Sequence, residues 1–372
     1  MSDPVLDALV DICGPDYARA ARSVDAVGGR RVALVAVPAT AQAATDVLRL
    51  AADRGLSVLP RGSGSKIDWG RPPTGVDLLL DTARLGGIWQ HDVGAATVEV
   101  GTGTPVRALQ AALALHGQRL PVDPPAPTAT VGGMLAVNES GPLRLRRGTP
   151  AEHVDRIAYV DLAGEAGDSD GEQGRPGISQ VTGVITSATV RLEALPGSRR
   201  WVGVTVASPL EVRDRVEQAL DNHPALAALE VDLPGNRSGT LAALFEDADA
   251  DAEALARAWG TDTTPIAPPW WGRYPFGRSE VALRLSTPVF DLAAAIYALG
   301  DAAGLAVPVR GSAGLGRVHA VLPGDLPPAR LEGVLDAMGH VFLARTGRVA
   351  VVSAPPEVAL RLDMASRQEL FS

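Results

Sequence analysis

Hydrophobic and polar residues in the first half of the chain alternate between strand-like and helix-like patterns. Runs of β-branched and aliphatic residues predict strands, and apolar residues three and four positions apart predict helices. Gly55 and Gly117 follow two helical stretches at the position where helices commonly end. The predicted helices cover residues 3–22, 40–55 and 104–117, the last with Thr104 as its N-cap. The predicted strands cover residues 31–38, 57–60, 76–82, 97–103, 157–163 and 182–196.

Two stretches between these elements lack a regular pattern. Residues 119–148 are rich in proline and glycine without being polar, and long irregular stretches inside compact domains are usually functional. Residues 164–177 are small and acidic with no apolar anchor, which predicts a solvated loop. A Pro-Gly-Ser break at 196–198 predicts a domain boundary.

The second half contains an internal repeat. The pattern strand, helix, strand, strand, helix begins at residue 201 and again about 80 residues later, at residue 280. This order is the ferredoxin-like pattern, in which helices cover one face of an antiparallel sheet. We therefore expect the two units to share one sheet. A loop at 268–279 with four aromatic residues separates them.

Composition and charge narrow the class of protein. With 372 residues the chain exceeds a typical single core, so we expect two or three domains. The formal net charge of −9 argues against nucleic acid or an anionic membrane surface as main partner. Cys13 is the only cysteine, which excludes an intrachain disulfide and a cysteine-ligated iron–sulfur cluster. Scattered histidines, an acidic amino terminus and no membrane-length apolar run predict a cytoplasmic protein with no metal site and no membrane span.

The stretch LPRGSGSKIDWG, residues 59–70, carries candidate chemistry. Backbone amides free of bulky side chains allow close approach of an anion such as a phosphate, although an ordinary surface turn has the same composition. A Walker A loop is excluded because Ile67 follows Lys66. The glycines at 101 and 103 do not form a Rossmann fingerprint, since Val106 occupies the third glycine position, and we assign them to a turn.

Several motifs occur in an order that resembles a known family. They are Arg61-Gly62-Ser63-Gly64-Ser65 after a strand, Asp123-Pro124-Pro125, Ala129-Thr130-Val131-Gly132-Gly133, Asn138, Ser140-Gly141-Pro142 and Gly183-Val184-Ile185-Thr186. The chain looks like a member of the PCMH-type (vanillyl-alcohol oxidase and p-cresol methylhydroxylase) superfamily of FAD-binding proteins. It is most similar to the small FAD-binding subunit of glycolate oxidase, which KIDWG at 66–70 and VRGSAGLG at 309–316 resemble in particular.

The resemblance implies an α+β fold. It would consist of an N-terminal helix (1–24), a two-subdomain FAD-binding domain (25–197) and a cap domain (198–372) of two ferredoxin-like βαββα repeats. By the same resemblance, amides of Gly62 to Ser65 wrap the FAD diphosphate, and the loop 130–133 completes the cradle. Ser65 stands where relatives often carry the histidine that attaches flavin covalently, so we expect non-covalent FAD. The implied cofactor-binding residues are Arg61, Gly62, Ser63, Gly64, Ser65, Thr130, Val131, Gly132, Gly133, Asn138, Gly141, Gly183 and Ile185.

The function implied is that of an FAD-dependent oxidoreductase acting on CH–OH groups. The chain would be a subunit of a 2-hydroxy-acid (glycolate-like) dehydrogenase, together with a larger flavin subunit and an iron–sulfur subunit. The main departure from the family pattern is the short acidic segment 164–181, which replaces a longer flavin-binding connection. Carboxylates at Glu165, Asp168, Asp170 and Glu172 would repel a diphosphate unless the segment swings into solvent. The alternative is a degenerate, non-catalytic subunit that serves as an assembly scaffold.

Other candidate residues carry weaker signals, and no catalytic base is identified. Arg273 and Arg310 are candidates for binding a substrate carboxylate, with ordinary ion pairing as the alternative. Among Arg144, Arg146 and Arg147, one is a candidate for an anion contact, against a solvated basic edge. Trp270, Trp271 and Tyr274 suit either a pocket wall or a partner surface. His319 alternates along a strand and is more often structural, while Asp68 and Trp69 match the family pattern without a derivable chemistry.

Overall fold

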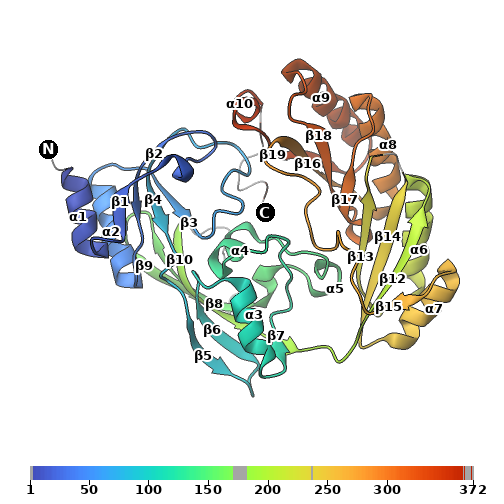
Figure 1. The fold of residues 1–372 in the computed structure, drawn as a ribbon, viewed down its shortest axis with the longest axis horizontal. Coiled ribbons are helices and arrows are strands. Elements are labelled where there is room, and N and C mark those ends of the chain that lie inside the picture. Colours follow the sequence, from blue (N-terminus) through green and yellow to red (C-terminus); the bar gives the residue numbers. More distant parts are fainter. Residues whose placement is uncertain (1–2, 171–181, 236–237, 363, 365–369, 371–372) are drawn as a thin grey trace.

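The computed structural model describes residues 3–170, 182–235, 238–362, 364 and 370. The elements form two lobes that lie side by side in Figure 1. We call the part up to β11 (Glu193–Ala194) the N-terminal lobe and the part from β12 (Arg199–Val206) onward the C-terminal lobe. The two strands follow each other closely in sequence, so a short connection passes between the lobes near the predicted boundary.

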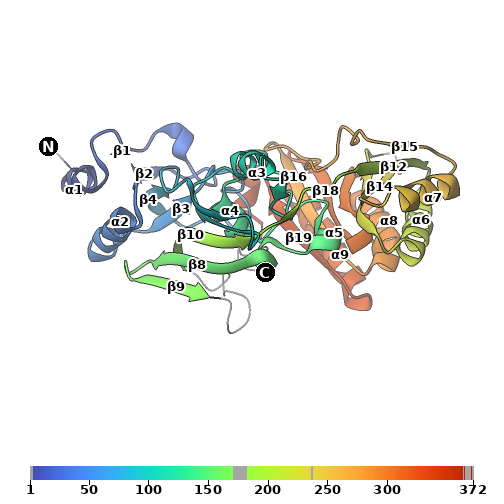
Figure 2. The same ribbon diagram turned by 90° about the horizontal axis from the view of Figure 1, so that it is seen from below.

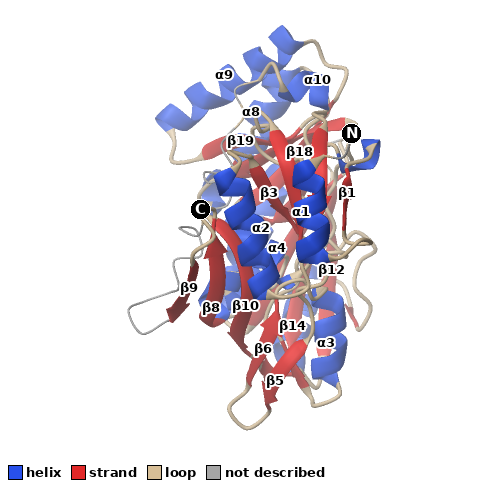
Figure 3. Cartoon of the chain, turned by 90° about the vertical axis from the view of Figure 1, so that its left-hand side faces the viewer, coloured by secondary structure: helices blue, strands red, loops and turns tan. Residues whose placement is uncertain are grey.

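A four-stranded sheet begins the N-terminal lobe. Its strand order is β1-β2-β4-β3; β2, β4 and β3 run parallel, and β1 is antiparallel to β2. Helices α1 (Pro4–Cys13) and α2 (Ala41–Asp53) cover one face, as Figure 3 shows. Leu78 and Leu80 pack toward these helices and Leu79 toward the other face, as strand alternation requires. The strands are β1 (Ala18–Ala20), β2 (Val32–Ala36), β3 (Val58–Arg61) and β4 (Val76–Asp81).

A five-stranded antiparallel sheet completes this lobe. Its order is β5-β6-β10-β8-β9, and β9 lies at the outer edge in Figure 2. The strands are β5 (Ile88–Asp92), β6 (Thr97–Gly101), β8 (Val154–Asp161), β9 (Ala166–Asp170) and β10 (Gly183–Arg191), with the short pair β7 (Gln118–Arg119) and β11. The helices are α3 (Val106–Ala114), α4 (Val131–Val137) and α5 (Arg144–Arg147), with 3-10 turns at Ser23–Asp25 and Pro150–His153.

Four predictions about these elements need correction. The first helix ends at Cys13 instead of residue 22, because Gly14 adopts φ +95° and the chain turns into β1. The helix after β6 begins at Val106, because the Thr104 hydroxyl donates to the carbonyl of Gly101 and Pro105 is the N-cap. Part of the stretch 119–148 is helical, as α4 and α5. Residues 166–170 form β9 instead of a loop, because they pair with β8; Glu172 lies outside the described residues.

The C-terminal lobe is built on one eight-stranded sheet of order β15-β12-β14-β13-β17-β18-β16-β19. In chain order its elements are β12-α6-β13-β14-α7, with β15 following, and then β16-α8-β17-β18-α9-β19. Each unit has the ferredoxin-like strand order 4-1-3-2, and their second strands, β13 and β17, pair antiparallel at the centre. The further strands are β13 (Leu226–Leu233), β14 (Gly239–Glu246), β15 (Thr263–Thr264), β16 (Glu280–Ser286), β17 (Val309–Ser312), β18 (Arg317–Pro323) and β19 (Arg348–Ser353).

The two faces of this sheet have different environments. Helices cover the outer face of the sheet in Figure 1. They are α6 (Pro209–Asn222), α7 (Asp249–Trp259), α8 (Leu292–Ala303) and α9 (Pro328–Ala344). The lobe also contains the short helix α10 (Pro356–Ala359) and 3-10 turns at Val289–Asp291 and Ala313–Leu315. In β16, Leu283 and Leu285 pack into the core under the helices, whereas Ala282 and Arg284 point to the inner face. The inner face meets the N-terminal lobe, so its polar side chains are buried between the lobes.

An ion-pair cluster joins the lobes at one end of their interface. Both terminal nitrogens of Arg119, in β7, donate to the carboxylate of Glu246, in β14, at 2.6 and 2.5 Å. Both side chains are almost fully buried, and Glu193, Arg147 and Arg199 complete the cluster. Arg147 is therefore part of an interlobe ion-pair cluster, and Arg146 donates to the carbonyl of Pro224.

Candidate functional site

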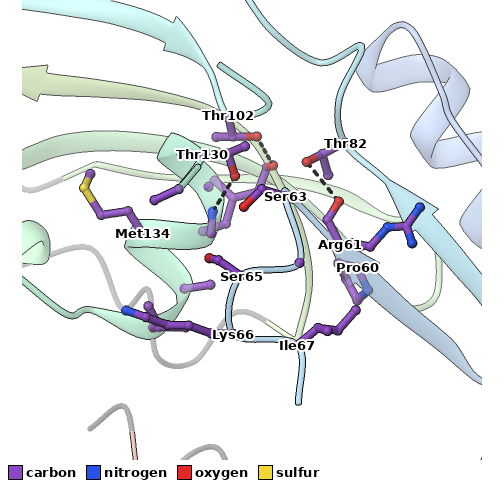
Figure 4. A pocket seen from close by; sticks show the side chains of 18 of the residues that line it. Pro60, Arg61, Ser63, Ser65, Lys66, Ile67, Thr82, Thr102, Thr130 and Met134 are labelled. Carbon is purple, nitrogen blue, oxygen red and sulfur yellow. Dashed lines mark hydrogen bonds between the residues drawn. The ribbon is translucent and has the colours of Figure 1, made fainter. Parts of the chain in front are cut away.

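A cavity of about 510 Å³ lies between the two sheets of the N-terminal lobe. It is lined by the loop after β3, by the start of α4 and by the start of β10. Figure 4 shows Ser63 near Thr102 and Thr130 at one end of the first loop, and Lys66 and Ile67 at the other. Volumes of 300 to 1,000 Å³ are typical of small-molecule and cofactor sites.

The first loop is a nest of free backbone donors. Among the described residues, the amides of Gly62, Ser63, Gly64, Ser65 and Lys66 donate to no protein acceptor. Gly64 has φ +73°, a conformation that glycine adopts without strain, and the amide of Ile67 donates to its carbonyl and closes the turn. Consecutive unpaired amides in such a bend form a concave site for an anion.

The second loop approaches the first closely. A Cβ on Gly62 would lie 2.2 Å from the Thr130 hydroxyl oxygen, and a Cβ on Gly132 would lie 2.8 Å from Cβ of Thr102. The amides of this loop already have acceptors: Val131 donates to Thr104, Gly132 to Thr102 and Gly133 to the Thr130 hydroxyl. The expectation that both loops present amides therefore fits the first loop, whereas the second forms a wall.

Arg61 lines the cavity, but its guanidinium points away from the amide nest. It donates to Asp25 at 3.0 Å and to Asp81 at 2.8 Å, and Asp25 is almost completely buried. Hydrogen bonding to Arg19 in particular, and to Arg61, lowers the pKa of Asp25 well below its ordinary range. These hydrogen bonds hold the start of the loop in place. The Arg61 side chain therefore helps to position the amides and does not itself contact an anion at the nest.

The other predicted cofactor residues divide into two groups. Gly183 and Ile185, at the start of β10, line the cavity at its far end. Three residues do not line it. Val131 is buried in the core, Asn138 caps α4 and accepts from the amide of Ala151, and Gly141 packs on the carbonyl of Asp123.

The cavity continues toward the C-terminal lobe. A second space of about 730 Å³ shares Ser65 and Pro124 with it, and its walls include Trp69, Trp271 and Phe276. A third pocket of about 60 Å³ shares Pro125, Gly272, Arg273 and Tyr274 with the second. The three spaces therefore adjoin one another along a cleft from the nest to the inner face of the eight-stranded sheet.

A buried polar cluster lies where this cleft meets the sheet. Glu139 accepts from Lys66 at 2.5 Å and from the Tyr274 hydroxyl at 2.9 Å, and it lies 4.0 Å from Arg284. Although burial opposes ionisation, Lys66 and the other cations keep the pKa of Glu139 below its ordinary value. Burial raises the pKa of Tyr274 well above its usual range. Glu139 thus joins the glycine loop to the C-terminal lobe.

Other predicted residues near the cleft have distinct positions. Arg310 donates to Asp232 at 2.8 Å, and Arg273 is exposed where the second space meets the third pocket. Trp69 is buried against Tyr274 and Phe276, while Asp68 accepts from the amide of Gly28. Trp271 packs on Trp201, and Trp270 lies beside Trp271.

Sequence patterns did not single out Glu139, Glu230, Arg284 and Arg317 as site residues. Glu230, Arg284 and Arg317 occupy the polar positions of alternating strands, a pattern that normally faces solvent. The described residues contain no cluster of three His, Cys, Asp or Glu side chains arranged to hold a metal ion. They also contain no helix long and apolar enough to cross a membrane.

Comparisons with known proteins agree with this geometry. Residues 32–168 match a family described as an FAD binding domain. A D-lactate dehydrogenase of Archaeoglobus fulgidus is 28% identical over 170 residues, which is 43% of this chain and 38% of the relative. The glycolate oxidase subunit GlcE of Escherichia coli is 36% identical over 107 residues, or 28% of this chain and 30% of the relative. The matches thus span about a third of these curated relatives.

Solved structures extend the similarity of fold to both lobes. An alkyldihydroxyacetonephosphate synthase superposes with a TM-score of 0.74 over 94% of this chain and 80% of its own, at 14% identity. A grass pollen allergen with glucose dehydrogenase activity gives a TM-score of 0.66 over 91% and 84%, also at 14% identity. Residues 32–168 are therefore a PCMH-type FAD-binding domain in an α+β chain of that fold, and FAD is the cofactor for which the nest and cavity are suited.

Proposed function

We propose that this chain is an FAD-dependent oxidoreductase that oxidises a small 2-hydroxy acid. The observation that carries the proposal is the series of adjoining spaces from the amide nest at 62–66 to a small, arginine-lined pocket at the C-terminal lobe. The names of two relatives, a D-lactate dehydrogenase and a glycolate oxidase subunit, support the substrate class. Both named substrates are 2-hydroxy acids, whose carboxylate suits a cationic pocket.

The chain's own residues would bind and orient the reactants. The five free amides would hold the FAD diphosphate, and Gly62 and Gly132 would leave room for it between the loops. When bound, FAD supplies the two-electron acceptor. Ser65 lines both larger spaces and offers no ring nitrogen for a covalent bond to flavin, which supports non-covalent binding. The inner face of the eight-stranded sheet would close over the substrate and exclude water.

Electrons must then leave the chain through another molecule. The sequence contains one cysteine, so it cannot ligate an iron–sulfur cluster through several thiolates. We propose a complex with a larger flavin subunit and an iron–sulfur subunit, as the similarity to a glycolate oxidase subunit suggests. We also propose a cytoplasmic location and the division into segments 1–24, 25–197 and 198–372.

A second candidate function is a non-catalytic scaffold of such a complex. The engaged amides of the second loop favour it, because that loop then offers a diphosphate fewer donors than expected. The acidic start of the shortened segment counts less, since Glu165 and Asp168 are exposed and Asp168 pairs with Arg156 at 2.5 Å.

Flavin content and reduction distinguish the two functions. The full chain is purified, its flavin absorbance is recorded, and glycolate or D-lactate is added without oxygen. The proposal predicts a yellow protein whose absorbance bleaches with one of these acids and whose FAD is released by heat. A colourless chain that takes up no added FAD, yet binds two other subunits, would favour the scaffold.

A matched pair of variants tests the nest itself. Gly64→Asp places a carboxylate at the diphosphate site, whereas Gly64→Asn places a neutral amide of the same shape at the same left-handed position. We expect the Asp variant to lose FAD and the Asn variant to keep a measurable part of it. Equal retention by both variants would show that no diphosphate lies at this bend.

A further inference from the structure

Two arginines that line the third pocket form no ion pair within the described part of the chain. Arg144, from α5, and Arg317, from β18, both line the pocket of about 60 Å³ between the lobes. Neither guanidinium forms a hydrogen bond or salt bridge with another described residue, and both are largely shielded from solvent. Burial, followed by the nearness of Arg144 and Arg284, lowers the pKa of Arg317 to about 10. Uncompensated buried cations are costly unless an anion joins them.

The carboxyl groups around this pocket do not supply that anion. Glu139 is held by Lys66 and Tyr274, and Asp232 is held by Arg310. Burial raises the pKa of Glu230 to about 8, so this side chain is neutral at pH 7. Glu139 attracts both guanidiniums and Glu152 attracts that of Arg144, but no described carboxylate lies within ion-pair distance of either, so the pocket can take one more anion.

The same pocket contains an unused neutral acceptor. His319, in β18, is 8% exposed, and its Nε2 atom is buried without a hydrogen-bond partner among the described residues. It lies 3.9 Å from the nearer oxygen of Glu139, too far for a hydrogen bond. Burial lowers the pKa of His319 to about 4, so the ring is neutral at pH 7. A neutral imidazole can present one ring nitrogen as an acceptor.

We propose that this pocket, called the arginine pocket, binds the hydroxy-acid end of the substrate. It is lined in part by Glu139, Arg144, Glu230, Arg310, Arg317 and His319. Arg144 and Arg317 hold the carboxylate, and the 2-hydroxyl group donates to Nε2 of His319. The inference rests on the proposed function for the identity of the anion. It replaces Arg273 and Arg310 as the carboxylate ligands, because Arg310 is already paired and Arg273 is exposed.

This arrangement makes specific chemical demands on the ligand. A pocket of about 60 Å³ takes only a few non-hydrogen atoms, so a carboxylate and its neighbouring hydroxyl fill it. A carboxylate without a hydroxyl leaves Nε2 of His319 unsatisfied and binds more weakly. The 2-oxo product also lacks a hydroxyl group that could donate to Nε2 of His319, so the pocket binds the substrate more tightly than the product.

The test measures binding without turnover. Equilibrium dialysis of the full chain with labelled glycolate or acetate is run without oxygen and with the flavin kept reduced, so glycolate is not consumed. We expect glycolate to bind more tightly than acetate. Arg144→Gln and Arg317→Gln should each weaken both anions about tenfold or more, and Arg317→Lys should recover part of the loss. His319→Phe should weaken glycolate alone and remove its advantage over acetate.

The control is Arg146→Gln, which alters an exposed arginine of the same helix that lies outside the pocket. Circular dichroism and flavin content are recorded for every variant. Unchanged carboxylate affinities in folded Arg144 and Arg317 variants would overturn the inference. It would also fail if these variants lost FAD but kept their carboxylate affinity, because the guanidiniums would then serve the cofactor.

The outcomes separate this inference from the proposed function. A chain that binds FAD and oxidises a 2-hydroxy acid, with Arg144 and Arg317 variants of unchanged affinity, retains the function and loses the arginine pocket. A chain without flavin whose variants still weaken carboxylate binding supports the pocket and contradicts the proposed oxidoreductase.

Discussion

Single glycines in the nest are required for two different reasons. Gly64 has φ +73°, which most side chains adopt only with strain. Gly62 has no such backbone constraint, yet a Cβ at this position would come within 2.2 Å of the Thr130 hydroxyl oxygen. Gly62 therefore keeps the two loops close together, and Gly64 allows the chain to turn.

Gly62→Ala tests the role of loop spacing. The added methyl group must push the first loop away from Thr130, so the amides no longer converge on one anion. We expect FAD affinity to fall by about tenfold or more in a fluorescence titration. Gly75→Ala is the matched control, because Gly75 has no positive φ and a Cβ there would have no neighbouring atom within 4 Å. Wild-type FAD affinity in Gly62→Ala would contradict the role assigned to this contact.

Glu230 should make stability depend on pH. Its pKa is raised from 4.5 to about 8 in the folded chain by burial and by nearby Asp123. The folded chain therefore holds a proton that the unfolded chain has lost, and the free energy of unfolding falls as pH rises through this interval. His319 acts oppositely, since its pKa is lowered from 6.5 to about 4 and its contribution is lost as pH falls below 6.5.

Between pH 6.5 and 8, the pH dependence of the free energy of unfolding therefore reports the buried carboxyl groups and not His319. Asp123, whose pKa is raised to about 7, contributes to this dependence in the lower part of the interval. Urea unfolding at several pH values should show that Glu230→Gln flattens the decline seen in the wild type. Glu165→Gln, at an exposed carboxylate, should keep the wild-type slope. A Glu230→Gln variant with an unchanged slope would show that this carboxyl group is ionised when folded.

Strand elements carry the contact between the lobes. Arg119 in β7 and Glu246 in β14 form a two-pronged ion pair in which the side chains are 4% and 3% exposed. Removing one partner of a buried pair leaves an unpaired buried charge, which costs roughly 3 to 5 kcal/mol. Arg147 and Arg199 still reach Glu246, so the lower part of that range applies to removal of Arg119.

We therefore expect Arg119→Leu to lower the free energy of unfolding by about 3 kcal/mol in chemical denaturation. Arg156→Gln, which breaks an exposed pair with Asp168, should have little effect. If Arg119→Leu were as stable as the wild type, the cluster around Glu246 would not contribute to holding the lobes together.

Element types were largely predictable from the sequence, and their ends were less so. Period-two alternation identified the strands of the C-terminal lobe, because Val281, Leu283 and Leu285 all face the helices. The end of α1 was missed because apolar residues continue past Gly14 in the sequence. In the structure, the buried residues of this helix are Leu9 and Cys13. β9 was missed because its residues are small and acidic, and its pairing with β8 supplies the order.

The nest was also predictable, whereas the arginine pocket was not. Residues 61–65 are contiguous, and their small side chains leave the backbone amides accessible, so the sequence alone predicts an anion site there. The pocket combines residues separated by up to 194 positions, from Pro125 to His319. Their alternation with apolar residues is the same as on a solvent-facing sheet, and only the packing of one lobe on the other buries them.

At the scale of the whole molecule, the carboxylate of Glu139 links the glycine loop to the C-terminal lobe. Glu139 contacts Lys66 from the glycine loop and Tyr274 from the C-terminal lobe. Bound FAD at about a hundred times its dissociation constant would stabilise the chain by about 2.7 kcal/mol. Because the loop is tied to both lobes through Glu139, we expect flavin release and loss of circular dichroism to occur in one thermal transition.

Glu139→Gln should separate these events. The amide cannot balance Lys66 and Arg284, so flavin fluorescence should appear at a lower temperature than the loss of circular dichroism. Glu165→Gln, at an exposed carboxylate far from this cluster in sequence, serves as control. Coincident transitions in Glu139→Gln would show that the link between loop and cap does not depend on this ion pair.

The seam where β13 pairs with β17 joins two repeats that carry different charges. Asp232 in the first repeat lies opposite Arg310 in the second, and the two are paired. If two identical chains met along this seam around a two-fold axis, every contact would occur twice, so a pair such as Asp232 with Arg310 could not be confined to one side of the axis. Covalent fusion of the repeats removes that restriction, so an acidic flank and a basic flank can diverge independently around a single site.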